Sequence, residues 1–118
     1  MAWDATCPDT FAATNMHLSC RVAGAAAIEA ESRKCAKYRL LDHSIEFQPV
    51  AVETMGSWGA TGLALVNEIG RRAAVEKCEP RAAAYLHQRI SMAIQRGNAC
   101  CIRATHPVTP LPPRPGIC

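Results

Sequence analysis

Alternation of apolar and polar side chains at the start of the chain predicts a short strand. In residues 1–6 (M-A-W-D-A-T), Trp3 and Ala5 fall on one face, whereas Asp4 and Thr6 fall on the other. Side chains that alternate with a period of two are typical of a strand. The strand should end at the proline that follows, because proline has no amide hydrogen to donate to a ladder.

A second strand is predicted near the middle of the chain. Residues 47–54 (F-Q-P-V-A-V-E-T) place Val50 and Val52 on one face and Glu53 on the other. Pro49 restricts the start of this segment to the edge or the entry of a sheet.

Helical windows make up most of the remaining sequence. Residues 62–75 and 81–103 repeat apolar side chains at helical spacing, and residues 21–41 form an Ala-rich, charged window without proline. Each window predicts a helix. Residues 8–19 have no such period and should form a loop. Five of the last 14 residues, 105–118, are proline, which predicts an extended, disordered tail.

The order strand-helix-strand-helix-helix predicts a helix-rich α/β domain over residues 1–104, followed by the tail. Two strands make only a marginal sheet in water. We therefore expect the first strand to pair with further strands, supplied either by a segment upstream of this one or by another chain.

Composition predicts a thin core and a soluble chain. Hydrophobic residues make up 49% of the sequence, but aromatic residues only 5%, and the abundant alanines bury little area each. No apolar stretch approaches the roughly 18 residues of a membrane span, and no secretory leader is visible. The net charge of +3 permits a nucleic-acid partner without requiring one.

The cysteines suggest a reducing compartment. There are seven, an odd number, and no C-x-x-C pair occurs. This pattern argues against a disulfide framework and against a zinc finger. We expect the chain in the cytoplasm or the nucleus, where thiols stay reduced.

Carboxylates at the two strand ends are the first candidates for chemistry. Asp4 and Glu53 could together hold a divalent cation, which prefers oxygen ligands. Lys34 and Lys37 are three positions apart in the predicted helix between the strands, so both can face the same side and one could polarise a phosphate. The alternative is that all four are solvated surface groups.

Arginines on the later helices are the second candidates. Arg89 and Arg96 are seven positions apart and continue to Arg103, so they share one helix face. Such a stripe could follow a phosphate backbone, although a solvated helix face has the same appearance. Arg71 and Arg72 add a further basic pair.

Several strings are more specific than these general signals. They are W-D-A-T-C-P-D-T-F (3–11), A-G-A-A-A (23–27), K-C-A-K-Y (34–38), F-Q-P-V-A-V-E-T-M-G-S-W-G (47–59), E-I-G-R-R (68–72) and Q-R-I-S-M-A-I-Q-R-G-N-A (88–99). In this order they resemble the extreme C-terminus of reverse-transcriptase-like proteins of non-LTR retrotransposons. The resemblance covers about residues 2–104.

The resemblance implies part of a restriction-like endonuclease domain of the PD-(D/E)xK type, which cleaves DNA with a divalent metal such as Mg²⁺. Asp4 falls on the metal-binding acid of that family. The family's K-x-x-K-Y helix falls on Lys34, Lys37 and Tyr38, which makes one of the lysines the catalytic one. Glu53 falls on the later strand, and the arginine faces would meet the DNA backbone.

Departures from the family pattern predict a loss of activity. The family's Pro-Asp segment and its polymerase half are absent from this sequence, so the metal site would lack one acid. Fewer charged ligands bind a cation more weakly, and we therefore expect a catalytically inactive remnant. Two alternatives remain: a small helical module that binds nucleic acid or protein, and a translated pseudogene without a selected function.

Overall fold

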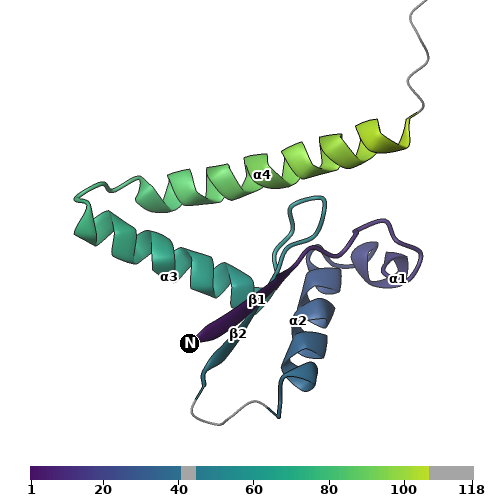
Figure 1. The fold of residues 1–118 in the computed structure, drawn as a ribbon, viewed down its shortest axis with the longest axis horizontal. Coiled ribbons are helices and arrows are strands. Elements are labelled where there is room, and N and C mark those ends of the chain that lie inside the picture. Colours follow the sequence, from purple (N-terminus) through teal and green to yellow (C-terminus); the bar gives the residue numbers. More distant parts are fainter. Residues whose placement is uncertain (41–44, 107–118) are drawn as a thin grey trace, which may run out of the picture.

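The computed structural model describes residues 1–40 and 45–106. Its elements run β1 (Ala2–Thr6), α1 (Met16–Ser19), α2 (Ala25–Lys37), β2 (Phe47–Ala51), α3 (Ala60–Glu76) and α4 (Ala82–Thr105) (Figure 1). The predicted helix-rich α/β class is confirmed. The order also holds, except that the predicted loop over residues 8–19 contains the short helix α1.

The two strands are parallel and α2 connects them. Ala2 pairs with Phe47 at one end of the ladder and Thr6 with Ala51 at the other. A parallel pair needs a long crossover, and a helix is the usual one. Figure 1 shows α2 against one side of the strand pair and α3 on the other, with α4 crossing above them.

Helix α2 is shorter than the predicted helix over residues 21–41. It starts after Gly24, whose φ of 84° lies in the left-handed region. A side chain there is also excluded, because a Cβ would come within 2.6 Å of the carbonyl oxygen of Trp58. The helix ends at Lys37, and the predicted end at residue 41 lies outside the described residues.

The last helix is longer than predicted. It continues through Thr105, so the predicted tail begins at least one residue later than expected. Apart from Thr105 and His106, the predicted tail lies outside the described residues.

The buried core is made largely of alanine. Ala27 and Ala30 on α2 cluster with Ala51 of β2, Ala26 is also buried, and Val66 of α3 is buried on the opposite side. The small side chains let α2 approach the strands closely, but each buries little area. The core is thin, as the composition predicts, so polar groups carry more of the packing.

Two buried glutamates serve as remote helix caps. Glu53, 1% exposed, follows β2, and its Oε1 accepts the amide hydrogens of Ala26 (3.1 Å) and Ala27 (3.4 Å) at the start of α2. The local N-cap position of α2 is Gly24, which offers no side-chain acceptor. The carboxylate therefore satisfies amides that the first helical turn leaves free, and its charge favours the positive end of the helix dipole.

Glu31 does the same for α3. This residue of α2 is 5% exposed, and its carboxylate accepts the amide hydrogens of Thr61 (3.0 Å) and Gly62 (2.7 Å). It also reaches the amide of Ala51 at 3.4 Å. The N-cap residue Gly59 leaves room for it, because a Cβ at Gly59 would overlap the Glu31 carboxylate.

Helices α3 and α4 form a hairpin through a close crossing. At Gly70 a Cβ would lie 2.7 Å from the Cα and Cβ of Ala83, so the two backbones approach each other there. His87 Nε2 and Asn67 Oδ1 are 2.7 Å apart across the same interface. Beyond this region α4 runs on past the strand layer (Figure 1).

Replacement of Glu53 by alanine should strongly destabilise the fold. It would leave two buried amide hydrogens without an acceptor, which costs about 2–4 kcal/mol in the free energy of unfolding. Urea denaturation followed by circular dichroism measures the loss. Glu29→Ala is the matched control, because Glu29 lies on α2, the helix that Glu53 caps, and its side chain is 53% exposed. An equal effect of both substitutions would contradict the capping role.

Two helical glycines should respond in opposite ways to alanine. Gly70→Ala should destabilise the chain by about 1–3 kcal/mol, because it forces α3 and α4 apart. Gly97 has no atom within 4 Å of an added Cβ, so Gly97→Ala should stabilise α4 by up to about 1 kcal/mol through helix propensity. Thermal and urea unfolding of both variants test the pair. Changes of the same sign would contradict the crossing at Gly70.

Candidate functional site

The strand carboxylate predicted from the sequence pairs with a lysine of α2. Asp4 Oδ2 accepts a hydrogen bond from Lys34 Nζ, which also forms an ion pair with it, and another from the Tyr38 hydroxyl at 3.0 Å. The donors are four positions apart and therefore share one helix face. Tyr38 is held in turn against the ring of Phe47, at a centroid distance of 4.6 Å.

These contacts stabilise the charged form of Asp4. The hydrogen bond from Lys34, followed by the one from Tyr38, lowers the pKa of the Asp4 carboxyl below its usual 3.8. Asp4 is therefore ionised at neutral pH and neutralises much of the charge of Lys34. The group is accessible to solvent, which screens the interaction.

Lys37 lies nearby but makes a different contact. Its Nζ lies 5.2 Å from the centroid of the Tyr38 ring, within the range of a cation–π interaction. Of the two candidate lysines, Lys34 thus contacts the carboxylate, while the Lys37 ammonium keeps its charge exposed beside the site.

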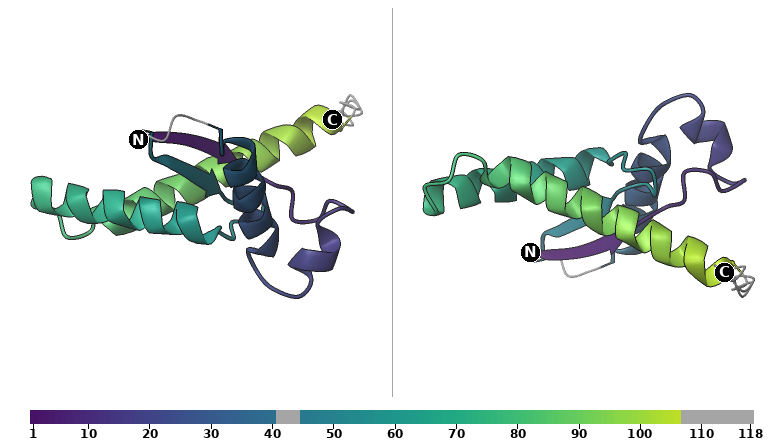
Figure 2. Two further views of the ribbon diagram at one scale, coloured as in Figure 1. Left: turned by 90° about the horizontal axis from the view of Figure 1, so that it is seen from below. Right: turned by 90° about the horizontal axis from the view of Figure 1, so that it is seen from above.

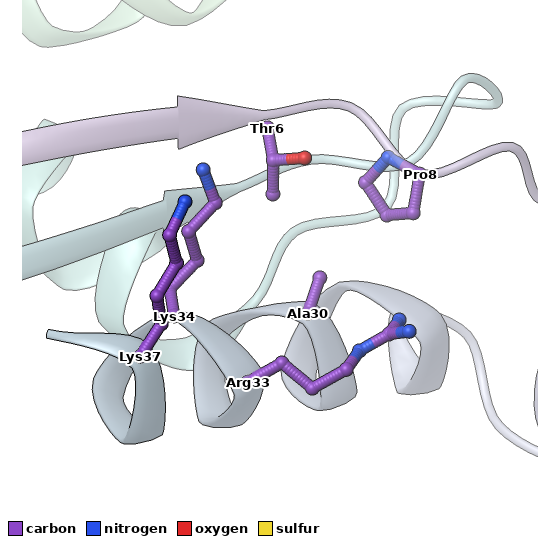
Figure 3. Close-up of a pocket in the computed structure, with 6 residues that line it drawn as sticks. All are labelled: Thr6, Pro8, Ala30, Arg33, Lys34 and Lys37. Atoms are coloured by element: carbon purple, nitrogen blue, oxygen red, sulfur yellow. The ribbon is translucent and has the colours of Figure 1, made fainter.

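A basic hollow adjoins the Asp4–Lys34 pair. It has a volume of about 360 Å³ and is lined by Thr6, Pro8, Ala30, Arg33, Lys34 and Lys37. Figure 3 shows both lysine side chains rising from α2 toward the strands, while Arg33 extends sideways along the helix past Ala30. Arg33 is only loosely paired with Glu29, at 3.9 Å between Nε and Oε1. The hollow is therefore suited to an anion.

Glu53, the other predicted catalytic acid, is not part of this arrangement. Its carboxylate lies at the first turn of α2, whereas Asp4 contacts Lys34 near the other end of the same helix. Seven to eight residues of helix separate these contacts, or roughly 11 Å along the axis. The structure thus brings Asp4 and Lys34 together, with Lys37 beside them, and assigns Glu53 to the capping of α2.

The donor set does not fit Mg²⁺. Within residues 1–40 and 45–106, no three His, Cys, Asp or Glu residues form a group that could hold a metal. Asp4 is alone, and its Oδ2 is already engaged by a lysine and a tyrosine. Mg²⁺ requires oxygen ligands and is repelled by neighbouring cations.

The predicted nucleic-acid arginines fall into two groups. Arg71 and Arg72 both donate to Glu68 at 2.7 Å, and these contacts, Arg71 first, lower the pKa of Glu68 to about 2. Their charge is therefore partly offset. Arg89 and Arg96 are exposed on α4 and form no ion pair among the described residues.

The sequence did not predict the capping role of Glu31, and it gave too little weight to Tyr38 as a partner of Asp4. Glu31 carried no signal, because its contacts are with amides 20 to 31 positions away. Tyr38 entered only through the family's helix motif, although its spacing of four from Lys34 would have placed both side chains on one face.

Two further expectations from the sequence concern membrane spans and disulfides. No helix in the described part of the chain is long and apolar enough to cross a bilayer. The six cysteines that the structure describes are free thiols.

The sequence matches no protein-family model and no curated protein, and the fold matches no solved structure.

Replacement of Lys34 by glutamine should raise the pKa of Asp4 toward 3.8, because it removes the largest cause of the shift. A depressed carboxyl pKa contributes stability above about pH 4, and this contribution is lost as the pH falls through the folded pKa. Carbon NMR titration of the Asp4 carboxyl measures the shift directly. Lys37→Gln is the control and should have a smaller effect. Equal titration in wild type and Lys34→Gln would contradict the pairing.

Proposed function

We propose that this chain derives from the C-terminal part of a retrotransposon-encoded, restriction-like endonuclease domain, and that it binds the phosphate backbone of DNA without cleaving it. The observation that carries the proposal is the Asp4–Lys34 pair, in which a strand carboxylate meets a helix lysine at the edge of a basic hollow. These are residues that the resemblance assigns to the endonuclease site.

The β1–α2–β2 unit supports the proposed origin. A carboxylate on one strand and a lysine on the connecting helix are both needed in the ancestral site, and here they are in contact. Helices α2 and α3 both pack against β2 of the parallel strand pair, which agrees with a fragment of a sheet flanked by helices.

The charges around the hollow support binding to an anion. Asp4 offsets one cation, that of Lys34, and Glu29 approaches Arg33 only at 3.9 Å. Lys37 and Arg33 therefore supply the excess positive charge. A phosphodiester group carries one negative charge and accepts hydrogen bonds from both types of side chain.

The carboxylates support the proposed lack of cleavage. Metal-assisted hydrolysis needs an ion that stabilises the attacking and leaving oxygens. Asp4 is a single carboxylate committed to Lys34 and Tyr38, and Glu53 is committed to α2. The described residues therefore offer a phosphate site rather than a metal site.

The second candidate is a binding module that uses α4. Arg89 and Arg96 are exposed on one helix that extends beyond its contacts with α3. They could contact a polyanion without any contribution from the hollow. The two candidates differ in which pair of cations controls affinity.

A salt titration of DNA binding separates them. Arg33→Gln/Lys37→Gln should weaken binding to a labelled duplex and reduce the slope of log affinity against log salt by about 2, because each lost phosphate contact contributes roughly 0.9. Arg89→Gln/Arg96→Gln removes the same charge from α4 and should leave the slope nearly unchanged. Fluorescence anisotropy measures both. The reverse result would assign binding to α4, and no binding by the wild type would refute the proposal.

Cleavage is tested separately on supercoiled plasmid with Mg²⁺. The wild type should nick no faster than Asp4→Asn. Nicking that disappears in Asp4→Asn would show that the chain is an active nuclease.

A further inference from the structure

The two outer edges of the strand pair differ. The outer edge of β2 is closed: Pro49 has no amide hydrogen, the amide of Ala51 donates to Glu31 (3.4 Å), and the carbonyl of Ala51 accepts from Gly59 (2.9 Å). No further strand can pair there without breaking these contacts.

The outer edge of β1 is open. The amide of Ala2 donates to Glu46, and the carbonyl of Thr6 accepts from Val52, so alternate residues of β1 direct their backbone groups toward β2. In a parallel ladder the residues between them, Trp3 and Ala5, direct theirs to the other side. Figure 2 shows β1 at the border of the molecule, and no described element lies beyond it.

An apolar groove adjoins this open edge. It has a volume of about 430 Å³, and its lining includes Met1, Trp3 and Ala5 from the β1 segment and Leu65 and Ile69 from α3. Met1 is 72% exposed and Trp3 is 64% exposed. Exposed edges with adjacent apolar side chains are the usual template for strand addition.

We propose that β1 pairs with β1 of a second copy of this chain, antiparallel and across a two-fold axis, to form a four-stranded sheet β2-β1-β1-β2. Trp3 would lie opposite Ala5 of the partner subunit, and Ala5 opposite the partner's Trp3. The amide and carbonyl groups of both residues form no hydrogen bond with another described residue, so this register forms two hydrogen-bonded pairs. It also sets a large side chain against a small one on the groove side.

The side chains beside the open edge of β1 favour β1 of a second copy as the added strand. A strand added to β1 must present apolar side chains to the groove on one face. On the other face it approaches Lys34 and Lys37 of α2, whose charge Asp4 only partly offsets, so an acidic residue fits there. The segment W-D-A of β1 has this pattern. In the proposed register, Asp4 lies directly opposite the partner's Asp4, and the repulsion between the two carboxylates is offset because each is already paired with Lys34 of its own copy.

The dimer would also stabilise the sheet, which has only the two strands β1 and β2 in the described part of one copy. Two strands are marginal on their own, whereas a sheet of three or more strands with an apolar face is stable. A two-fold axis perpendicular to the sheet makes the same patch contact itself in both copies. This axis keeps both α2 helices on one face of the four-stranded sheet. The proposed dimer does not depend on DNA binding.

Sedimentation equilibrium and hydrogen exchange of the full chain test the proposal. The expected mass is twice the 12.7 kDa of one chain, and the amides of Trp3 and Ala5 should exchange more slowly as the protein concentration rises. Trp3→Lys should raise the dissociation constant of the dimer at least about tenfold, because it places a charge in the groove interface. Phe11→Lys is the matched control, since Phe11 is 65% exposed and lies away from the β1 edge, and it should leave the dimer intact.

Ala5→Pro provides a second variant. It removes one outward amide hydrogen and leaves the hydrogen bonds to β2 in place, since proline is tolerated where the edge amide faces outward. It should also weaken the dimer while circular dichroism stays unchanged. A monomer at all concentrations, or a dimer that both β1 variants leave intact, would overturn the proposal. A dimer that Phe11→Lys disrupts as strongly as Trp3→Lys would overturn it as well.

Discussion

The fold depends on two buried carboxylates that cap helices distant from them in sequence. Glu53 holds the start of α2, and Glu31, from α2, holds the start of α3. Each of these buried side chains leaves water only because backbone amides and a helix dipole replace its hydration. The two caps form a chain, β2 to α2 to α3, so that the loss of one cap loosens both helices. An alanine core alone would bury too little area to fix these helices.

This arrangement also fixes the candidate site. Glu53 anchors one end of α2, and the Asp4–Lys34 pair joins the other half of the helix to β1. The basic hollow lies between these two attachments, so its cations project from a helix that cannot easily rotate. The same carboxylate that positions Lys34 also lowers the local positive charge. The attraction for an anion therefore comes mainly from Lys37 and Arg33.

Much of the architecture could be predicted because it is local. Periodicity located both strands and the three long helices within a few residues, whereas the parallel pairing of the two strands was not predicted. The contact between Asp4 and Lys34 joins two residues of the sequence-based site, whose function stays a prediction. The position of Glu53 could not be anticipated, because a strand-end glutamate looks the same whether it faces a cation or a helix terminus. Glu31 was missed for a similar reason: its amide partners belong to another helix, and no sequence period marks them.

The two faces of β1 differ in polarity, so one strand could contribute both to the basic hollow and to pairing with a second copy. Its α2 face carries a carboxylate that a lysine neutralises and a tyrosine hydrogen-bonds, and its other face carries exposed apolar side chains. A fully solvated surface strand would have no reason to expose Trp3 beside an unpaired edge, since exposed apolar edges favour association. The site on one face and the open edge are therefore compatible: strand pairing uses backbone groups in the plane of the sheet, while an anion would approach from the α2 side.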